Sequence, residues 1–287
     1  MTKILTNNYQ FREYCVLFAD ILNQAEKVDQ LRNVPDPNDV GQFPVFVDKL
    51  RQTAGVIVAM AQIFNEAFDS LEGRRQKFST LPADARDDFI SRTLHPIDRQ
   101  LFSDSMLYYL PLYQEEGQCP EWAICKLFFA AYTTYLFGLQ AEHPLRGAIT
   151  YGYAGVFGEN GLYGPALLDA YRIESNLARY PRIVVATSLV HELQSRASKL
   201  TPKEIQTIMS AHLSQKCLQF IAQDTDGLYV IDPQGRHNSE YREIHKEPLE
   251  KAIRFVNREL VRFQSLGDAK LTSRYYELLM LLSTSDC

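Results

Sequence analysis

The spacing of apolar residues changes along the first half of the chain and predicts alternating strands and helices. Residues 14–22 are almost continuously apolar, which is typical of a strand that is buried on both faces. From residue 47 to residue 71, apolar side chains recur every three or four positions, which predicts a long amphipathic helix. Residues 99–112 form two apolar arms around Ser103, Asp104 and Ser105, and this composition favours a β-hairpin.

The second half of the chain combines a strongly apolar segment with a glycine-rich one. Residues 122–139 are apolar nearly all round and follow Pro120, which predicts a buried helix; the run contains Lys126 and is shorter than a membrane-spanning helix requires. Between Gly152 and Gly164, five glycines punctuate alternating apolar residues, and Pro165 then opens a helix. This segment predicts a strand, a loop, a short returning strand and a helix. The remaining expected elements are strands at 182–187 and 227–231 and helices at 83–94, 188–198, 201–222, 249–263 and 271–282.

Composition and charge limit the classes of protein to which the chain can belong. Of its 287 residues, 46% are hydrophobic and 23% are charged, as in ordinary globular proteins. We expect one elaborated domain, with its core in residues 1–200 and a mainly helical extension in residues 201–287 packed on that core. The net charge of −5 argues against binding to nucleic acid or to a membrane surface. Five cysteines without metal-type spacing favour a reducing, cytoplasmic environment.

Two aspartates, Asp20 and Asp104, are candidates for a functional role. Asp20 lies within the apolar end of the first predicted strand, where burial of an unpaired charge is costly. A metal ion, a cation or several hydrogen-bond donors would satisfy it, and so would helix capping or a salt bridge. Asp104 lies at the tip of the predicted hairpin, where aspartate is common simply because it forms turns. Position alone leaves a structural role and a metal-binding role open for both residues.

Short motifs around these positions resemble those of a known enzyme family. The matching residues are Phe18, Asp20 and Ile21 in the pattern F-x-D-I, Leu145, Arg146 and Gly152 in a glycine-rich strand, and Gly164, Ala170 and Arg172 in the pattern G-x-x-V-N-x-A-x-R. Together they resemble the catalytic domain of class III nucleotidyl cyclases, over residues 14–187. Residues 163–174 and 180–183 are similar to a variant found in the pyrimidine nucleotide cyclases of bacterial Pycsar anti-phage systems. Leu168 stands where the family pattern has Asn.

The resemblance implies an α+β fold: a ferredoxin-like class III cyclase core with a helical insertion at about residues 40–95 and a helix-rich C-terminal part. It also implies conversion of UTP or CTP to the 3′,5′-cyclic monophosphate and pyrophosphate, as a second messenger for anti-phage defence. Two divalent ions, Mg²⁺ or Mn²⁺, would be bound by the side chains of Asp20 and Asp104 and by the carbonyl of Ile21. Arg172 would stabilise the negative charge that develops at the α-phosphate.

The same resemblance implies that Ile21, Leu22, Asn23, Gln24 and Gln100 bind the nucleotide. Backbone amides of Leu22, Asn23 and Gln24 would cradle the triphosphate. Gln100 and Gly161 occupy the places where purine cyclases select the base. Because an amide can both donate to and accept from a pyrimidine edge, Gln100 favours a pyrimidine nucleotide.

The resemblance also implies a homodimer. The family completes its active site across two domains, and this chain has one copy of each motif, so a second copy of the chain is expected as the partner. The alternative function is a catalytically inactive relative that binds a nucleotide or a protein partner. Leu168, in place of the family Asn, is the main argument for that alternative.

Overall fold

The computed structural model describes residues 9–22, 24–73, 97–112, 120–157, 161–198 and 205–283 of the chain. Within these residues, helices pack on one mixed sheet. This arrangement is consistent with the α+β class expected from the sequence. The helix predicted at residues 83–94 lies outside the described residues, as does Asn23.

The sheet forms the centre of the protein, and its strands run in the order β2-β3-β1-β4-β6-β8-β7, with β5 paired to β4. β1 pairs antiparallel with β3 and with β4, whereas β4 and β6 are parallel. The central position of β1 explains its continuous apolar sequence, because both of its faces contact packed side chains. The strands are β1 (Tyr9–Ile21), β2 (Asp98–Leu101), β3 (Ser105–Pro111), β4 (Leu145–Phe157), β5 (Leu162–Tyr163), β6 (Ile183–Val185), β7 (Ile221–Gln223) and β8 (Tyr229–Ile231).

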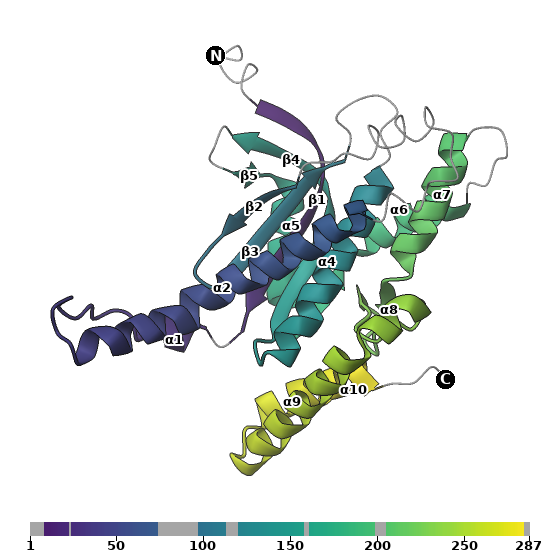
Figure 1. The fold of residues 1–287 in the computed structure, drawn as a ribbon. Helices are drawn as coiled ribbons and strands as arrows, with labels where there is room; N and C mark the ends of the chain where they lie inside the picture. Colours follow the sequence, from purple (N-terminus) through teal and green to yellow (C-terminus); the bar gives the residue numbers. More distant parts are fainter. Residues whose placement is uncertain are drawn as a thin grey trace.

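Helices cover both faces of this sheet (Figure 1). α2 and α4 lie on one face, where they form the main core with Leu17 of β1. α5 lies on the other face, where Ala166 and Ala170 pack with Tyr14 and Val16 of β1. Successive β1 side chains therefore enter different layers, as the pleat of a strand requires. The helices are α1 (Ala25–Asp29), α2 (Gln42–Gly73), α4 (Pro120–Gln140), α5 (Pro165–Asn176), α6 (Thr187–Ser198), α7 (Ile205–Leu218), α8 (Ser239–Ile244), α9 (Lys246–Ser265) and α10 (Ala269–Ser283).

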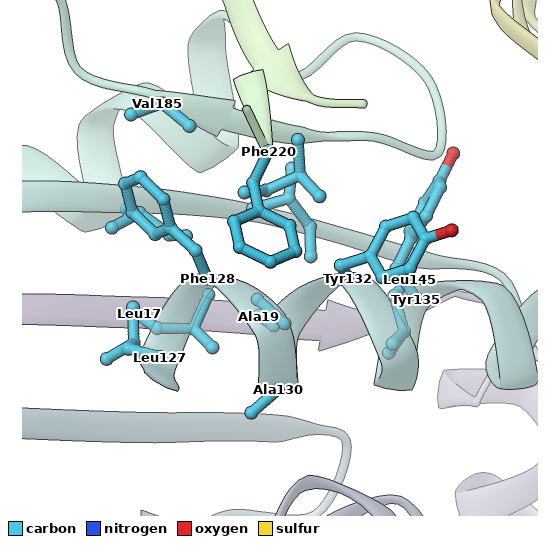
Figure 2. Close-up of a cluster of buried hydrophobic side chains, with 14 of the residues drawn as sticks. Leu17, Ala19, Leu127, Phe128, Ala130, Tyr132, Tyr135, Leu145, Val185 and Phe220 are labelled. Carbon is cyan, nitrogen blue, oxygen red and sulfur yellow. The ribbon is translucent and has the colours of Figure 1, made fainter. Parts of the chain in front are cut away.

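α4 is the apolar helix at the centre of the main core. Figure 2 shows Phe128 and Tyr132 of this helix beside Phe220, which comes from the C-terminal part of the chain. The expectation that this helix is too short to span a membrane was wrong, because among the described residues Pro120–Gln140 is long and apolar enough to do so. However, 94% of its most apolar window is buried inside the protein. The predicted buried helix is therefore confirmed, because packing against protein accounts for an apolar surface on every side.

α2 belongs partly to the core and partly extends beyond it. Its 32 residues span about 48 Å at 1.5 Å per residue. One face is buried in the main core from Thr53 to Leu71, whereas no side chain in residues 42–52 is buried. The second half of α2 is thus a core helix, although the sequence suggested an insertion at about residues 40–95. The core elements follow the order β1-α2-β2-β3-α4-β4.

The C-terminal part joins the same sheet through the β7–β8 hairpin, since β8 pairs with β6. Arg182 stabilises this junction. Its side chain is 1% exposed and contacts Asp224 at 2.5 Å and Asp226 at 2.6 Å. It also donates to the carbonyl oxygen of Leu177, at the end of α5, over 2.8 Å. The extension expected at residues 201–287 therefore continues the core sheet as well as packing on it.

The remaining differences from the sequence prediction concern element ends and short elements. The helix predicted at residues 201–222 ends at Leu218, because residues 221–223 form the strand β7. α1, α8 and β7 were not predicted. They contain five, six and three residues, which is too few for a periodic pattern to emerge.

Candidate carboxylate site

The two aspartates singled out in the sequence meet at one end of the sheet. Asp20 stands one residue before the end of β1, and the β1–β3 register places it opposite Ser105. Asp104 directly precedes β3, and its carbonyl oxygen accepts a hydrogen bond from the Ile21 N–H over 2.8 Å. The Ser105 hydroxyl lies 3.2 Å from Oδ1 of Asp20 and 3.4 Å from Oδ1 of Asp104. The turn between β2 and β3 thus holds Asp104 beside Asp20.

The surroundings of Asp20 leave its negative charge only partly compensated. The pKa of Asp20 is raised from the ordinary value of 3.8 to about 6, and desolvation by burial is the largest cause. The neighbouring carboxylates of Asp104 and Glu174 contribute to this rise, whereas the Arg146 guanidinium and the Ser105 hydroxyl act in the opposite direction. Burial and like charges therefore outweigh the compensating groups at Asp20.

Arg146 and Glu174 are two members of the site to which the sequence analysis assigned no role. Arg146 is the β4 residue paired with Asp20, and its Nη2 lies 3.6 Å from Oδ2 of that aspartate. Its Nε donates to Oε1 of Glu174 over 2.5 Å, and Glu174 is 3% exposed. A signal was present, because Glu174 continues the buried stripe of α5 that contains Ala166 and Ala170. A carboxylate on such a stripe requires a buried partner.

The carboxylate pair suits a hard divalent cation. Among the described residues, no group of three or more His, Cys, Asp and Glu side chains could hold a metal ion. A pair of carboxylates is nevertheless a common arrangement for Mg²⁺, which keeps several water ligands and takes the rest from substrate phosphates. The under-compensated charge at Asp20 fits that chemistry. The main chain of Ile21 adjoins both aspartates, because Ile21 follows Asp20 in the chain and its N–H donates to the carbonyl oxygen of Asp104.

The residues expected to cradle a triphosphate follow directly after β1. The Leu22 N–H donates to the carbonyl oxygen of Pro144 over 3.0 Å, so this amide is already engaged. Gln24 is 2% exposed, and neither of its side-chain amide atoms has a hydrogen-bond partner within the described structure. Asn23 lies outside the described residues. Of the three backbone amides expected to bind the triphosphate, that of Leu22 is therefore the one with a hydrogen bond inside the described structure.

An open cavity of about 970 Å³ lies between the β2–β3 hairpin and α5, next to the carboxylate site. Ser105 lines this cavity and also contacts Asp20, so the cavity adjoins the carboxylate site. Most of the cavity wall is apolar. The main apolar lining residues are Phe18, Phe102, Leu107, Leu162, Leu167 and Tyr171. The volume and the lining suit a ring-containing ligand of nucleotide size.

Gln100 and Gly161, the two expected base-selecting positions, lie against each other. A Cβ atom placed on Gly161 would stand 1.7 Å from Nε2 of Gln100, so a larger residue would displace this amide. Gly161 also has a φ of +94°, a conformation that favours glycine. Gln100 lines the cavity, and its amide is therefore placed where a ligand ring could meet it.

Arg172 lies on the outer side of α5, while the inner side of this helix faces the sheet. Its side chain is 63% exposed, and its ion pair in the described structure is with Asp169, at 3.8 Å. Arg172 lines the cavity. Because its ion-pair partner is Asp169, it does not pair with Asp20 or Asp104 of the same chain in the described structure. Leu168, at the position of the family Asn, is 46% exposed and lines the same cavity.

Neither a scan against protein-family models nor a search of curated proteins found a match to this chain.

Proposed function

We propose that the protein is a nucleotidyl cyclase that converts UTP or CTP to the 3′,5′-cyclic monophosphate and pyrophosphate. The observation that carries the proposal is the approach of Asp20 to Asp104 at the edge of a nucleotide-sized cavity. The order β1-α2-β2-β3-α4-β4 is the β-α-β-β-α-β order of ferredoxin-like folds, which supports a cyclase-type core. The resemblance to Pycsar cyclases further favours a cytoplasmic enzyme whose product is a second messenger in anti-phage defence.

The reaction is a displacement within one nucleotide. The 3′-oxygen attacks the α-phosphorus, the 3′-hydroxyl loses its proton, and the bond to the pyrophosphate oxygen breaks. Two divalent ions, Mg²⁺ or Mn²⁺, held by Asp20, Asp104 and the Ile21 carbonyl, would supply a lower pKa for the 3′-hydroxyl and neutralisation of phosphate charge. Arg172 would stabilise the charge that develops on the α-phosphate. The Gln100 amide would hydrogen-bond to the edge of the base.

The position of Arg172 favours a site shared between two copies of the chain. Its guanidinium is on the outer side of α5 and does not reach the aspartates of its own chain. A two-fold homodimer would combine Asp20 and Asp104 of one subunit with Arg172 of the other, in two equivalent sites. Large apolar side chains beside the cavity are partly exposed, including Phe102 at 51% and Tyr171 at 55%, which suits an interface.

The second candidate is a catalytically inactive relative that binds a nucleotide or a protein partner. Leu168 favours it, because leucine cannot donate the hydrogen bonds of the family Asn. The acidic pair argues for the enzyme, since a purely structural role gives no reason to keep two carboxylates together at Asp20 and Asp104.

The test is to incubate the purified protein with each of the four nucleoside triphosphates and Mn²⁺, and to identify the products by mass. We expect cyclic UMP or cyclic CMP, and we expect Asp20→Asn and Asp104→Asn each to abolish its formation while remaining folded. Asp48→Asn is the matched control, because Asp48 is exposed on α2 and its ion pair in the described part of the chain is with Arg51. Full activity of either site variant would refute the two-metal assignment.

A further inference from the structure

Arg146 lies between two carboxylates and is held much more closely by one of them. Its Nε–Oε1 distance to Glu174 is 2.5 Å, a short charge-assisted hydrogen bond. Its Nη2–Oδ2 distance to Asp20 is 3.6 Å, which is too long for a hydrogen bond. A single guanidinium carries one positive charge. It therefore compensates Glu174 well and Asp20 poorly.

The deeper burial of Glu174 favours its ion pair with Arg146 over a contact between Arg146 and Asp20. The Glu174 side chain is 4% exposed, whereas that of Asp20 is 21% exposed. Removing the guanidinium from the more deeply buried carboxylate has the higher cost, because that carboxylate has less water to replace its partner. α5 is itself packed against β1 and β4 through Ala166 and Ala170, so Glu174 cannot easily follow Arg146 toward Asp20.

The charged groups around Asp20 come from four parts of the fold. β1 provides Asp20, the β2–β3 turn provides Asp104, β4 provides Arg146 and α5 provides Glu174. Three carboxylates and one guanidinium give a formal charge of −2 when all are ionised. This excess equals in magnitude the charge of one divalent cation. The carboxylates left to bind such a cation are those of Asp20 and Asp104, because Arg146 hydrogen-bonds to Glu174.

We propose that Glu174 is a positioning residue that keeps the Arg146 guanidinium away from Asp20 and so leaves Asp20 open to a divalent cation. This inference rests on the proposed function, in which Asp20 and Asp104 bind metal ions. Without the Glu174 charge, Arg146 turns toward Asp20 and competes with the cation. Glu174 therefore contributes to metal binding without touching the metal.

The experiment measures the affinity of the full-length protein for Mn²⁺ alone, from the electron paramagnetic resonance signal of the free ion. Glu174→Gln keeps the size of the side chain and an oxygen that can accept from Arg146, and it should weaken Mn²⁺ binding about tenfold. The double variant Glu174→Gln with Arg146→Gln restores the charge of −2 and removes the competitor. Its affinity should return to within about threefold of wild type, because the net charge at Asp20 and Asp104 is unchanged.

Glu192→Gln is the control, because Glu192 also accepts from an arginine Nε, that of Arg196 at 2.7 Å, in a more exposed ion pair on α6 outside the site. It should bind Mn²⁺ like wild type. Thermal melts establish that every variant is folded. Wild-type affinity in Glu174→Gln would overturn the positioning role and leave the metal site standing. Equal weakening in the single and the double variant would overturn it as well, because removal of the Arg146 guanidinium would then restore no affinity and competition by Arg146 could not be the cause. Failure of the wild type to bind Mn²⁺ would remove this inference and the proposed function together.

Discussion

Replacement of Asp20 by Asn should stabilise the folded protein near neutral pH, even though it removes a residue of the proposed active site. The pKa of Asp20 rises from 3.8 to about 6 on folding, mainly because of burial. A rise of this size in the pKa corresponds to about 3 kcal/mol against the charged form. The side chain is 21% exposed, so water screens part of this cost, and we expect a gain of about 1 kcal/mol. Asn still accepts a hydrogen bond from Ser105.

The pH dependence of this gain follows from the direction of the pKa shift. Between about pH 4 and pH 6 the folded state binds more protons at Asp20 than the unfolded state does, so the wild-type protein loses stability as pH rises. The advantage of Asp20→Asn should therefore be absent below about pH 4 and complete above about pH 6. A gain confined to low pH would contradict the assignment of the charge.

Urea unfolding at pH 4 and pH 8, with EDTA and at one fixed protein concentration, measures the difference in the free energy of unfolding. Fixed concentration matters because dimerisation adds to apparent stability. At pH 8 the variant should unfold at a higher urea concentration, and a thermal melt should rise by about 2–4 °C. Asp48→Asn, at an exposed position, should leave stability unchanged. A variant that is less stable than wild type at pH 8 would refute the view that Asp20 is an under-compensated charge.

Three further substitutions test separate parts of the structure. Gly161→Ala should displace the Gln100 amide and weaken UTP or CTP binding about tenfold, measured by calorimetry, while Mn²⁺ affinity stays at the wild-type value. Arg182→Met leaves the buried Asp224 carboxylate without its guanidinium and should lower the free energy of unfolding by about 3–5 kcal/mol, measured in urea. Arg172→Ala should change the free energy of unfolding by less than about 0.5 kcal/mol, because this side chain is 63% exposed. It should reduce turnover at least about 100-fold.

Periodicity and punctuation predicted most of the fold because the strongest patterns belong to the most buried elements. The continuous apolar run in β1 and the all-round apolar surface of α4 both reflect packing on every side. The short elements α1, α8 and β7 gave no such pattern, because their positions depend on tertiary contacts. The ends of α7 and β7 depend likewise on pairing with β8.

The candidate site was only partly predictable for a related reason. The approach of Asp20 to Asp104 follows from a hairpin that pairs with β1, and a family resemblance already indicated both residues. Arg146 is in β4 and Glu174 is in α5, so their ion pair forms only when the register of β4 and the rotation of α5 bring them together. The sequence showed that Glu174 lies on the same helix stripe as Ala166 and Ala170, but it did not show that the partner of Glu174 is Arg146.

The most direct test of the central claim mixes two inactive variants. Asp20→Asn and Arg172→Ala should each fail to form a cyclic nucleotide from UTP or CTP, since each breaks both sites of its own homodimer. After subunit exchange, about half of the dimers contain one copy of each variant, and one of the two sites in such a dimer carries neither defect. Turnover should therefore recover to roughly a quarter of wild type. No recovery, despite proven exchange of subunits, would contradict a shared cyclase site built from Asp20 of one chain and Arg172 of the other.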